Sequence, residues 1–147
     1  MKIRNANSKD VSEITKLLGE LGRPQPKNKL ERAKFQKLIH HYISDNDKQI
    51  LLAEDDSKLV GMASLVFLPR LNQSKPELWI PDLVVSKDYR RKGIGKELIK
   101  ACVKIAKTKN CFRIRLESGN KRKDTHEFYK KIGFEQYALT FRKVVKN

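Results

Sequence analysis

A basic turn with two glycines follows an apolar strand within Leu83–Lys96, and its residue types suit the binding of a phosphate. Gly93 and Gly95 lie at the expected start of a helix, where glycine lets the backbone approach a ligand closely and adopt a positive φ. A helix N-terminus offers unpaired N–H groups and about half a positive charge. The cations of Arg90–Lys92 lie beside it. The pattern predicts an anion site, and the predicted ligand group is a pyrophosphate.

Two better-known phosphate motifs are absent from this sequence. It has no Gly-x-x-x-x-Gly-Lys-Ser/Thr segment, which excludes a P-loop. The third glycine of a dinucleotide-binding fingerprint is also missing, because Lys96-Glu97-Leu98 follows Gly95. A bare Gly-x-Gly is a weak signal, so ordinary turn glycines are the alternative interpretation of Gly93 and Gly95.

Two separate segments resemble one known family. Arg90-x-x-Gly93-x-Gly95 is similar to the coenzyme A signature Arg/Gln-x-x-Gly-x-Gly/Ala of the GNAT N-acetyltransferases. Ser118–Phe134 resembles the stretch after that family's fifth strand, where a short helix ends in an FY…GF pattern. This stretch is similar to small-molecule members such as aminoalkylphosphonate N-acetyltransferase, except that Thr125 replaces the usual alanine before the histidine.

The resemblance implies an enzyme that moves the acetyl group of acetyl-CoA onto a primary amine within a ternary complex. It makes Tyr129 the general acid that protonates the departing thiolate. It also implies that a backbone N–H of Val84 or Val85 stabilises the oxyanion. The residues that it assigns to cofactor binding are Leu83, Val84, Val85, Arg90, Arg91, Lys92, Gly93, Ile94, Gly95, Lys96, Asn120, Phe128 and Lys131.

A general base is needed because the attacking amine must be neutral. Asp82 and Glu77 are the candidates, and Asp82 directly precedes the expected oxyanion strand. Asp82 either takes the proton, directly or through water, or only orients the acceptor, whereas Glu77 is expected to be exposed at the start of the strand. Pro81 predicts a bulge beside Asp82. His126 is interpreted as a surface or packing residue rather than a catalytic one, and no metal site is expected.

The order of elements predicts an α+β domain of the GNAT fold, with a mixed, mostly antiparallel sheet flanked by about four helices. Asp10 and Glu13 form a capping-box pattern ahead of the first helix. The expected strands are Lys2–Arg4, Gln49–Glu54, Leu59–Phe67, Glu77–Val85, Phe112–Glu117 and Gln136–Val144, and the other expected helices are Lys29–Ser44, one that opens at Arg90–Gly95, and Asp124–Lys131.

Length and composition fit one small domain, residues 1–147, in the cytoplasm. The 147 residues include 39% hydrophobic and 34% charged side chains, and no apolar run is long enough to span a bilayer. We expect no signal peptide at Met1–Asn7, and we expect Cys102 and Cys111 to be reduced structural thiols.

The formal net charge of +16 leaves the partner open. Lysine and arginine are spread along the chain, so a nucleic-acid-binding module is the less favoured alternative of another class. The favoured acceptor is a small-molecule amine, and a protein N-terminus or lysine is the alternative. By analogy with the fold, a homodimer could form through Gln136–Val144.

Overall fold

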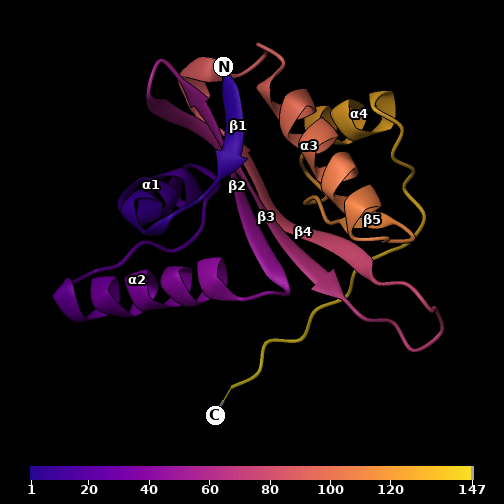
Figure 1. The fold of residues 1–147 in the computed structure, drawn as a ribbon, viewed down its shortest axis with the longest axis horizontal. Helices are drawn as coiled ribbons and strands as arrows, with labels where there is room; N and C mark the ends of the chain where they lie inside the picture. Colours follow the sequence, from indigo (N-terminus) through magenta and orange to yellow (C-terminus); the bar gives the residue numbers. More distant parts are fainter. Residues whose placement is uncertain (147) are drawn as a thin grey trace. The chain divides into compact units, whose positions relative to one another are not determined.

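The computed structural model describes residues 1–146, and the chain divides into two compact units. The first unit is Met1–Leu116 and the second begins at Glu117. Figure 1 shows the elements of both units, which are described separately below.

A five-stranded sheet forms the centre of the first unit, and it confirms the predicted α+β class. The strand order is β1-β2-β3-β4-β5, with antiparallel pairing from β1 to β4 and parallel pairing of β4 with β5. The strands are β1 (Lys2–Asn5), β2 (Lys48–Asp55), β3 (Lys58–Leu68), β4 (Glu77–Val85) and β5 (Ile114–Leu116). The parallel pair requires a crossover, which the helix α3 (Ile94–Thr108) supplies.

Helices cover both faces of this sheet. The helices α1 (Val11–Glu20) and α2 (Lys29–Ser44) lie on one side of it, and α3 lies on the other (Figure 1). Their apolar residues recur at helical spacing, and the buried cluster under α1 and α2 includes Ile14, Ile39, Leu52, Met62 and Val84.

The α3 face depends on a residue without a side chain. A Cβ on Gly61 of β3 would lie 3.3 Å from atoms of both Ile94 and Leu98, so glycine lets α3 approach the sheet. Cys102 of α3 is fully buried, and burial raises the pKa of its thiol to about 12, which makes it a core residue rather than a nucleophile.

The predicted Asp10–Glu13 capping box is wrong. The box is formed one turn earlier, by Asn7 and Asp10 around the short 3-10 helix Ser8–Asp10. In that box the Asp10 carboxylate accepts a hydrogen bond of 2.8 Å from the Asn7 N–H, and Arg4 donates two more of 2.9 Å to it. Glu13 instead pairs with Lys16 on the helix surface.

The second unit contains the helix α4 (Lys123–Lys131) and a tail that is not a strand, so the predicted strand Gln136–Val144 is wrong for the chain as described. Its alternating apolar residues match a strand, but a strand needs a hydrogen-bonded neighbour. Among residues 117–146 there is no second strand that could provide one.

Candidate functional site

The sheet opens where β4 leaves β5. Pairing of the two parallel strands ends at Ile80 and Leu116, whereas β4 stays paired with β3 as far as Val85. The register against β3 shifts at the same point, which confirms the bulge predicted from Pro81. Residues 81–85 therefore have one edge that β5 does not cover.

The register also decides which N–H groups point to this open edge. Ser86 donates its N–H to Val60 on the β3 side, and the direction alternates along a strand. The N–H of Val84 therefore points toward β3, and those of Leu83 and Val85 point to the open edge. Of the two expected oxyanion donors, only Val85 has this orientation.

Side chains from other elements satisfy the carbonyl groups of the bulge. Pro81 has no N–H, and the carbonyl of Leu65 opposite it accepts a hydrogen bond of 3.2 Å from the Tyr42 hydroxyl. The carbonyl of Pro81 accepts a hydrogen bond of 3.1 Å from Arg23 Nη2. The bulge is therefore fixed by α2 and by the α1–α2 connection.

The basic turn leads directly into an uncapped helix. Gly93 is the N-cap of α3 with φ 83°, and no side chain caps the first turn. By contrast, Asn28 caps α2 by accepting a hydrogen bond from the Glu31 N–H. A Cβ on Gly93 would meet no atom within 4 Å, so the space above the turn is open. An anion placed there would accept hydrogen bonds from the N–H groups that no side chain caps.

Cations surround this turn. The Tyr89 ring holds the ammonium of Lys92 at 4.9 Å and that of Lys58 at 5.4 Å from its centroid. Arg91 has the strained φ of 62° and is exposed. Arg90 donates from Nε to the Val85 carbonyl at 3.0 Å, which links the turn to the open edge. The residues present therefore fit a polyphosphate group.

Asp82, the predicted base, lies at the bulge with both carboxylate oxygens occupied. Its Oδ2 accepts a hydrogen bond of 2.7 Å from Ser64, which is buried on β3. Its Oδ1 accepts a hydrogen bond of 2.9 Å from Arg23 Nε, and Arg23 Nη2 lies 2.9 Å from the same oxygen as an ion pair. Burial raises the pKa of the nearby Tyr42 to about 12, and the negative charge of Asp82 adds to this shift. Tyr42 therefore stays protonated at neutral pH.

Glu77 is not the exposed carboxylate that the sequence suggested. Its side chain is 0% exposed and is bound by Arg70 at 3.0 Å, Arg113 at 2.8 Å and Arg115 at 2.9 Å. Burial alone would raise the pKa of Glu77, but the hydrogen bonds from Arg113 and Arg115 outweigh it and hold the pKa below its usual value. This ionised and fully bound group is a structural anchor and a poor candidate for the base.

The remaining predicted residues belong to the second unit. Asn120 lies in the loop before α4, and Phe128, Tyr129 and Lys131 lie on α4. The FY…GF pattern has a local cause: Gly133, at φ 97°, ends the helix, and the Phe134 N–H donates to the Tyr129 carbonyl. The rings of Tyr129 and Phe134 then meet edge to face at 5.5 Å.

His126 fits the packing interpretation. Its Nε2 lies 2.8 Å from the Gly119 carbonyl, which ties α4 to the preceding loop. The site assignments of the second unit stay predictions.

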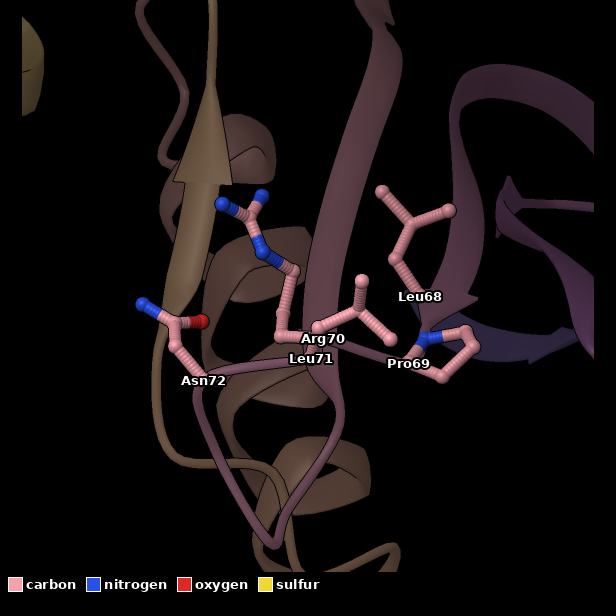
Figure 2. A pocket seen from close by; sticks show the side chains of 5 residues that line it. All are labelled: Leu68, Pro69, Arg70, Leu71 and Asn72. Atoms are coloured by element: carbon pink, nitrogen blue, oxygen red, sulfur yellow. The ribbon is translucent and has the colours of Figure 1, made fainter.

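A surface depression lies elsewhere on the first unit. It measures about 430 Å³ and is lined by the consecutive residues Leu68, Pro69, Arg70, Leu71 and Asn72 (Figure 2). Because one loop makes up its whole wall, it is a fold of the β3–β4 connection rather than a cleft between elements. Within residues 1–146, no cluster of side chains could hold a metal ion, and no helix is long and apolar enough to cross a bilayer.

Three residues at the bulge were missed by sequence reasoning. Arg23 and Tyr42 are 59 and 23 residues away from the groups that they bind, and nothing in their own neighbourhood marks them. Ser64 lies 18 residues before Asp82. An alignment of the two predicted strands that allowed for the bulge at Pro81 would have placed Ser64 opposite Asp82.

Comparisons with known proteins agree with this geometry. The profile of the acetyltransferase (GNAT) family matches residues 14–134. Glucosamine 6-phosphate N-acetyltransferase of Trypanosoma brucei brucei is 27% identical to this chain and covers 97% of it, with 94% of its own length. Aminoalkylphosphonate N-acetyltransferase of Salmonella typhimurium is 27% identical and covers 98% of the chain, with 91% of its own length.

A solved structure shares the fold. Glucosamine-6-phosphate N-acetyltransferase from Arabidopsis thaliana superimposes with a TM-score of 0.83 at 21% identity, over 99% of this chain and 98% of that one. The matched range of the family profile contains both the basic turn and the FY…GF segment. The chain therefore belongs to the acetyltransferase (GNAT) family and is an N-acetyltransferase that uses acetyl-CoA.

Proposed function

We propose that this enzyme acetylates the primary amine of a small molecule by direct attack in a ternary complex. The observation that carries the proposal is the open edge of β4, which starts at the bulge beside Asp82 and leads to the uncapped start of α3. Both curated relatives described above match over nearly their full length and are named for small amines that carry a phosphate or phosphonate. A protein N-terminus or lysine is the alternative acceptor.

Groups of the first unit would bind the pyrophosphate and the amide-bearing arm of acetyl-CoA, which supplies an activated thioester. The N–H groups that Gly93 leaves uncapped would bind its pyrophosphate, with Arg90–Lys92 and Lys96 around it. The open edge of Leu83 and Val85 would hold the amide-bearing arm through backbone hydrogen bonds. Ile94 begins α3 beside the turn. We expect Asn120, Phe128 and Lys131 to add contacts, as the family pattern implies.

Residues of the chain would then transfer protons and stabilise the negative charge that develops during the reaction. Asp82 receives the proton of the acceptor ammonium or orients the neutral amine. The Val85 N–H binds the oxygen that becomes negative as the C–N bond forms. Tyr129 gives its proton to the sulfur as the C–S bond breaks. An amine that enters as an ammonium loses two protons as it becomes an amide. The first leaves before the attack, to Asp82 or to solvent, and the second leaves the nitrogen as the intermediate collapses and replaces the proton that Tyr129 gave to the sulfur.

The proposal extends to the organisation of the protein. We expect the two units to act together as one domain of residues 1–147. A homodimer would give the exposed apolar side chains Tyr137, Leu139 and Phe141 a covering surface. Cys102 and Cys111 are both free thiols, in keeping with a reducing, cytoplasmic location.

Ligand-dependent thermal stability tests the proposal. Acetyl-CoA and CoA at about 100 times their dissociation constants should each stabilise the protein by about 2.7 kcal/mol, whereas ATP and a short DNA duplex should not. Thiol release should then appear when primary amines are added. Stabilisation by the DNA but by neither CoA species would instead support the nucleic-acid alternative, whose affinity must fall steeply with salt.

The Tyr129→Phe variant adds the mechanistic part of this test. Turnover should fall by about two to four orders of magnitude, because the thiolate departs without a proton donor. The dissociation constant for CoA should change little. An unchanged turnover number would show that Tyr129 is not the general acid, and it would leave acetyl-CoA as the acetyl donor.

A further inference from the structure

The ion pair between Arg23 and Asp82 joins two opposite charges at the place where the acceptor would react. Arg23 binds one oxygen of Asp82 through both Nε and Nη2, at 2.9 Å. The Arg23 side chain is 52% exposed and that of Asp82 is 18% exposed, so the pair can be reached from solvent. An acceptor ammonium that approaches Asp82 therefore meets a cation already in its place.

The pair lies on the face of the sheet opposite α3. Val84, two residues after Asp82, packs into the core under α1 and α2, and side chains two apart on a strand share a face. On the other face, a Cβ on Gly61 would lie 3.3 Å from Ile94 and from Leu98 of α3. The basic turn at the start of α3 and the Arg23–Asp82 pair are thus separated by the sheet, which opens beside the pair.

The backbone at Arg23 is fixed while its side chain is exposed. Gly22, at φ 90°, ends α1, and the Arg23 N–H donates to the Leu18 carbonyl while the Gly22 N–H donates to that of Gly19. These two bonds are the Schellman motif. Asp82 is also fixed, since Ser64 holds its other oxygen at 2.7 Å. The guanidinium can therefore leave Asp82 without a change in the backbone at either residue.

A second donor on the same face has no partner. Trp79 pairs with Val66, two residues after Ser64, so it shares the face of Asp82. Its indole Nε1 is buried and makes no hydrogen bond among residues 1–146. A buried N–H without an acceptor costs about 1–3 kcal/mol, and a ligand oxygen would remove that cost.

We propose that the Arg23–Asp82 pair recognises the acceptor by exchange of partners, and that the acceptor is an amine carrying an anionic group such as a phosphate, phosphonate or carboxylate. This inference rests on the proposed function and names its substrate class. The acceptor ammonium replaces the guanidinium on Asp82, and Arg23 turns to the acceptor's anion. Asp82 and Arg23 each keep a partner of opposite charge in this exchange. An amine without an anionic group would leave the Arg23 guanidinium without one.

Binding of two amines that differ only in a phosphate tests the exchange. Phosphoethanolamine and ethanolamine are titrated calorimetrically into protein saturated with CoA, with inorganic phosphate as a third probe. The wild type should bind phosphoethanolamine at least about tenfold more tightly than ethanolamine and than phosphate, because each of these offers only one of the two charges.

Variants assign the preference to Arg23. Arg23→Gln should reduce the preference for phosphoethanolamine to less than about threefold, and Arg23→Lys should retain more of it, because the charge remains. Arg32→Gln, which removes the same charge from an exposed position on α2, should leave the preference as it is. In turnover, Arg23→Gln should raise KM for phosphoethanolamine more than it changes kcat.

Two results would overturn the exchange. Equal affinity of the wild type for both amines would show that an anionic group on the acceptor is not recognised. A preference that survives in Arg23→Gln would move recognition to another residue. In both cases stabilisation of the wild type by CoA would leave the proposed function standing, whereas its absence would remove the proposed function and this inference together.

Discussion

At the scale of single residues, the two candidate carboxylates of β4 have different surroundings. Asp82 is bound by one arginine and one serine at the bulge, where the sheet is open. Glu77 is bound by three arginines and has no exposed surface. The two carboxylates are five positions apart on one strand, yet a ligand can reach Asp82, whereas Glu77 holds the structure together.

Removing the charge of Glu77 should therefore cost stability and leave cofactor binding intact. Glu77→Gln leaves three guanidiniums without their shared carboxylate, and we expect a loss of about 2–3 kcal/mol in the free energy of unfolding at pH 7. Glu13→Gln, on the exposed surface of α1, should cost less than about 0.5 kcal/mol. Urea unfolding measures both.

The pH dependence gives this prediction a second readout. Because the pKa of Glu77 is lowered in the folded state, its contribution is complete above the ordinary pKa near 4.5 and is lost as pH falls toward the folded value. Between pH 5 and pH 3 the wild type should lose more stability than Glu77→Gln does. Parallel pH profiles would contradict an ionised, stabilising Glu77.

At the scale of elements, the start of α3 combines strain, missing caps and charge. Gly93 adopts a positive φ that a residue with a Cβ reaches only at a cost, although the space beside it is open. The conformation of the turn is therefore set by the backbone rather than by packing. Its purpose would be to direct N–H groups at a ligand.

Alanine at Gly93 should affect both stability and cofactor affinity. Gly93→Ala strains φ at 83°, so we expect about 1 kcal/mol less stability and about tenfold weaker CoA binding as the turn shifts. Gly22→Ala provides the same strain at φ 90° at the end of α1 and should lose stability without a change in CoA affinity. Calorimetric titration of CoA against both variants distinguishes the two, and equal CoA affinities would contradict a phosphate role for the turn.

At the scale of the whole molecule, charge and apolar surface point to different partners. The net charge of +16 attracts anions of any size, whereas Tyr137, Leu139 and Phe141 expose apolar area at alternate positions. Alternation with period two is the pattern of a half-buried strand. The tail thus has the sequence of a strand and no strand beside it within its own unit.

The proposed homodimer predicts a mass twice that of the chain in light scattering at tens of micromolar protein. The double variant Leu139→Asp and Phe141→Asp should shift the mass to that of the monomer, since burying two carboxylates is unfavourable. Leu71→Asp, at a fully exposed leucine of the β3–β4 connection, should leave the mass unchanged. A monomeric wild type would contradict the dimer.

Features encoded by neighbouring residues could be predicted from the sequence. The basic turn at Gly93, the bulge at Pro81 and the helix end at Gly133 each depend on a few residues in a row. The α+β order followed from apolar spacing in the same way. Acetyl-CoA as the acetyl donor was predicted from the resemblance to the family, because the spacing of residues alone could not identify it.

Features that depend on distant segments could not be predicted. Glu77 was expected to be exposed because it begins a strand, yet its partners Arg113 and Arg115 lie 36 and 38 residues further along. Arg23 reaches Asp82 only because the end of α1 lies beside the bulge. The segment Gln136–Val144 has the apolar spacing of a strand, but a strand forms only where a neighbouring strand accepts its hydrogen bonds. The spacing of a segment does not show whether such a neighbour exists.

The uncapped start of α3 has a consequence for the protein's lifetime. Without a ligand, its first turn has N–H groups that no side chain holds, so this turn should open more readily than the rest of the helix. Proteases cleave such opened segments, and bound donor closes them. We therefore expect the steady-state amount of this enzyme to rise and fall with the supply of acetyl-CoA, even at constant synthesis.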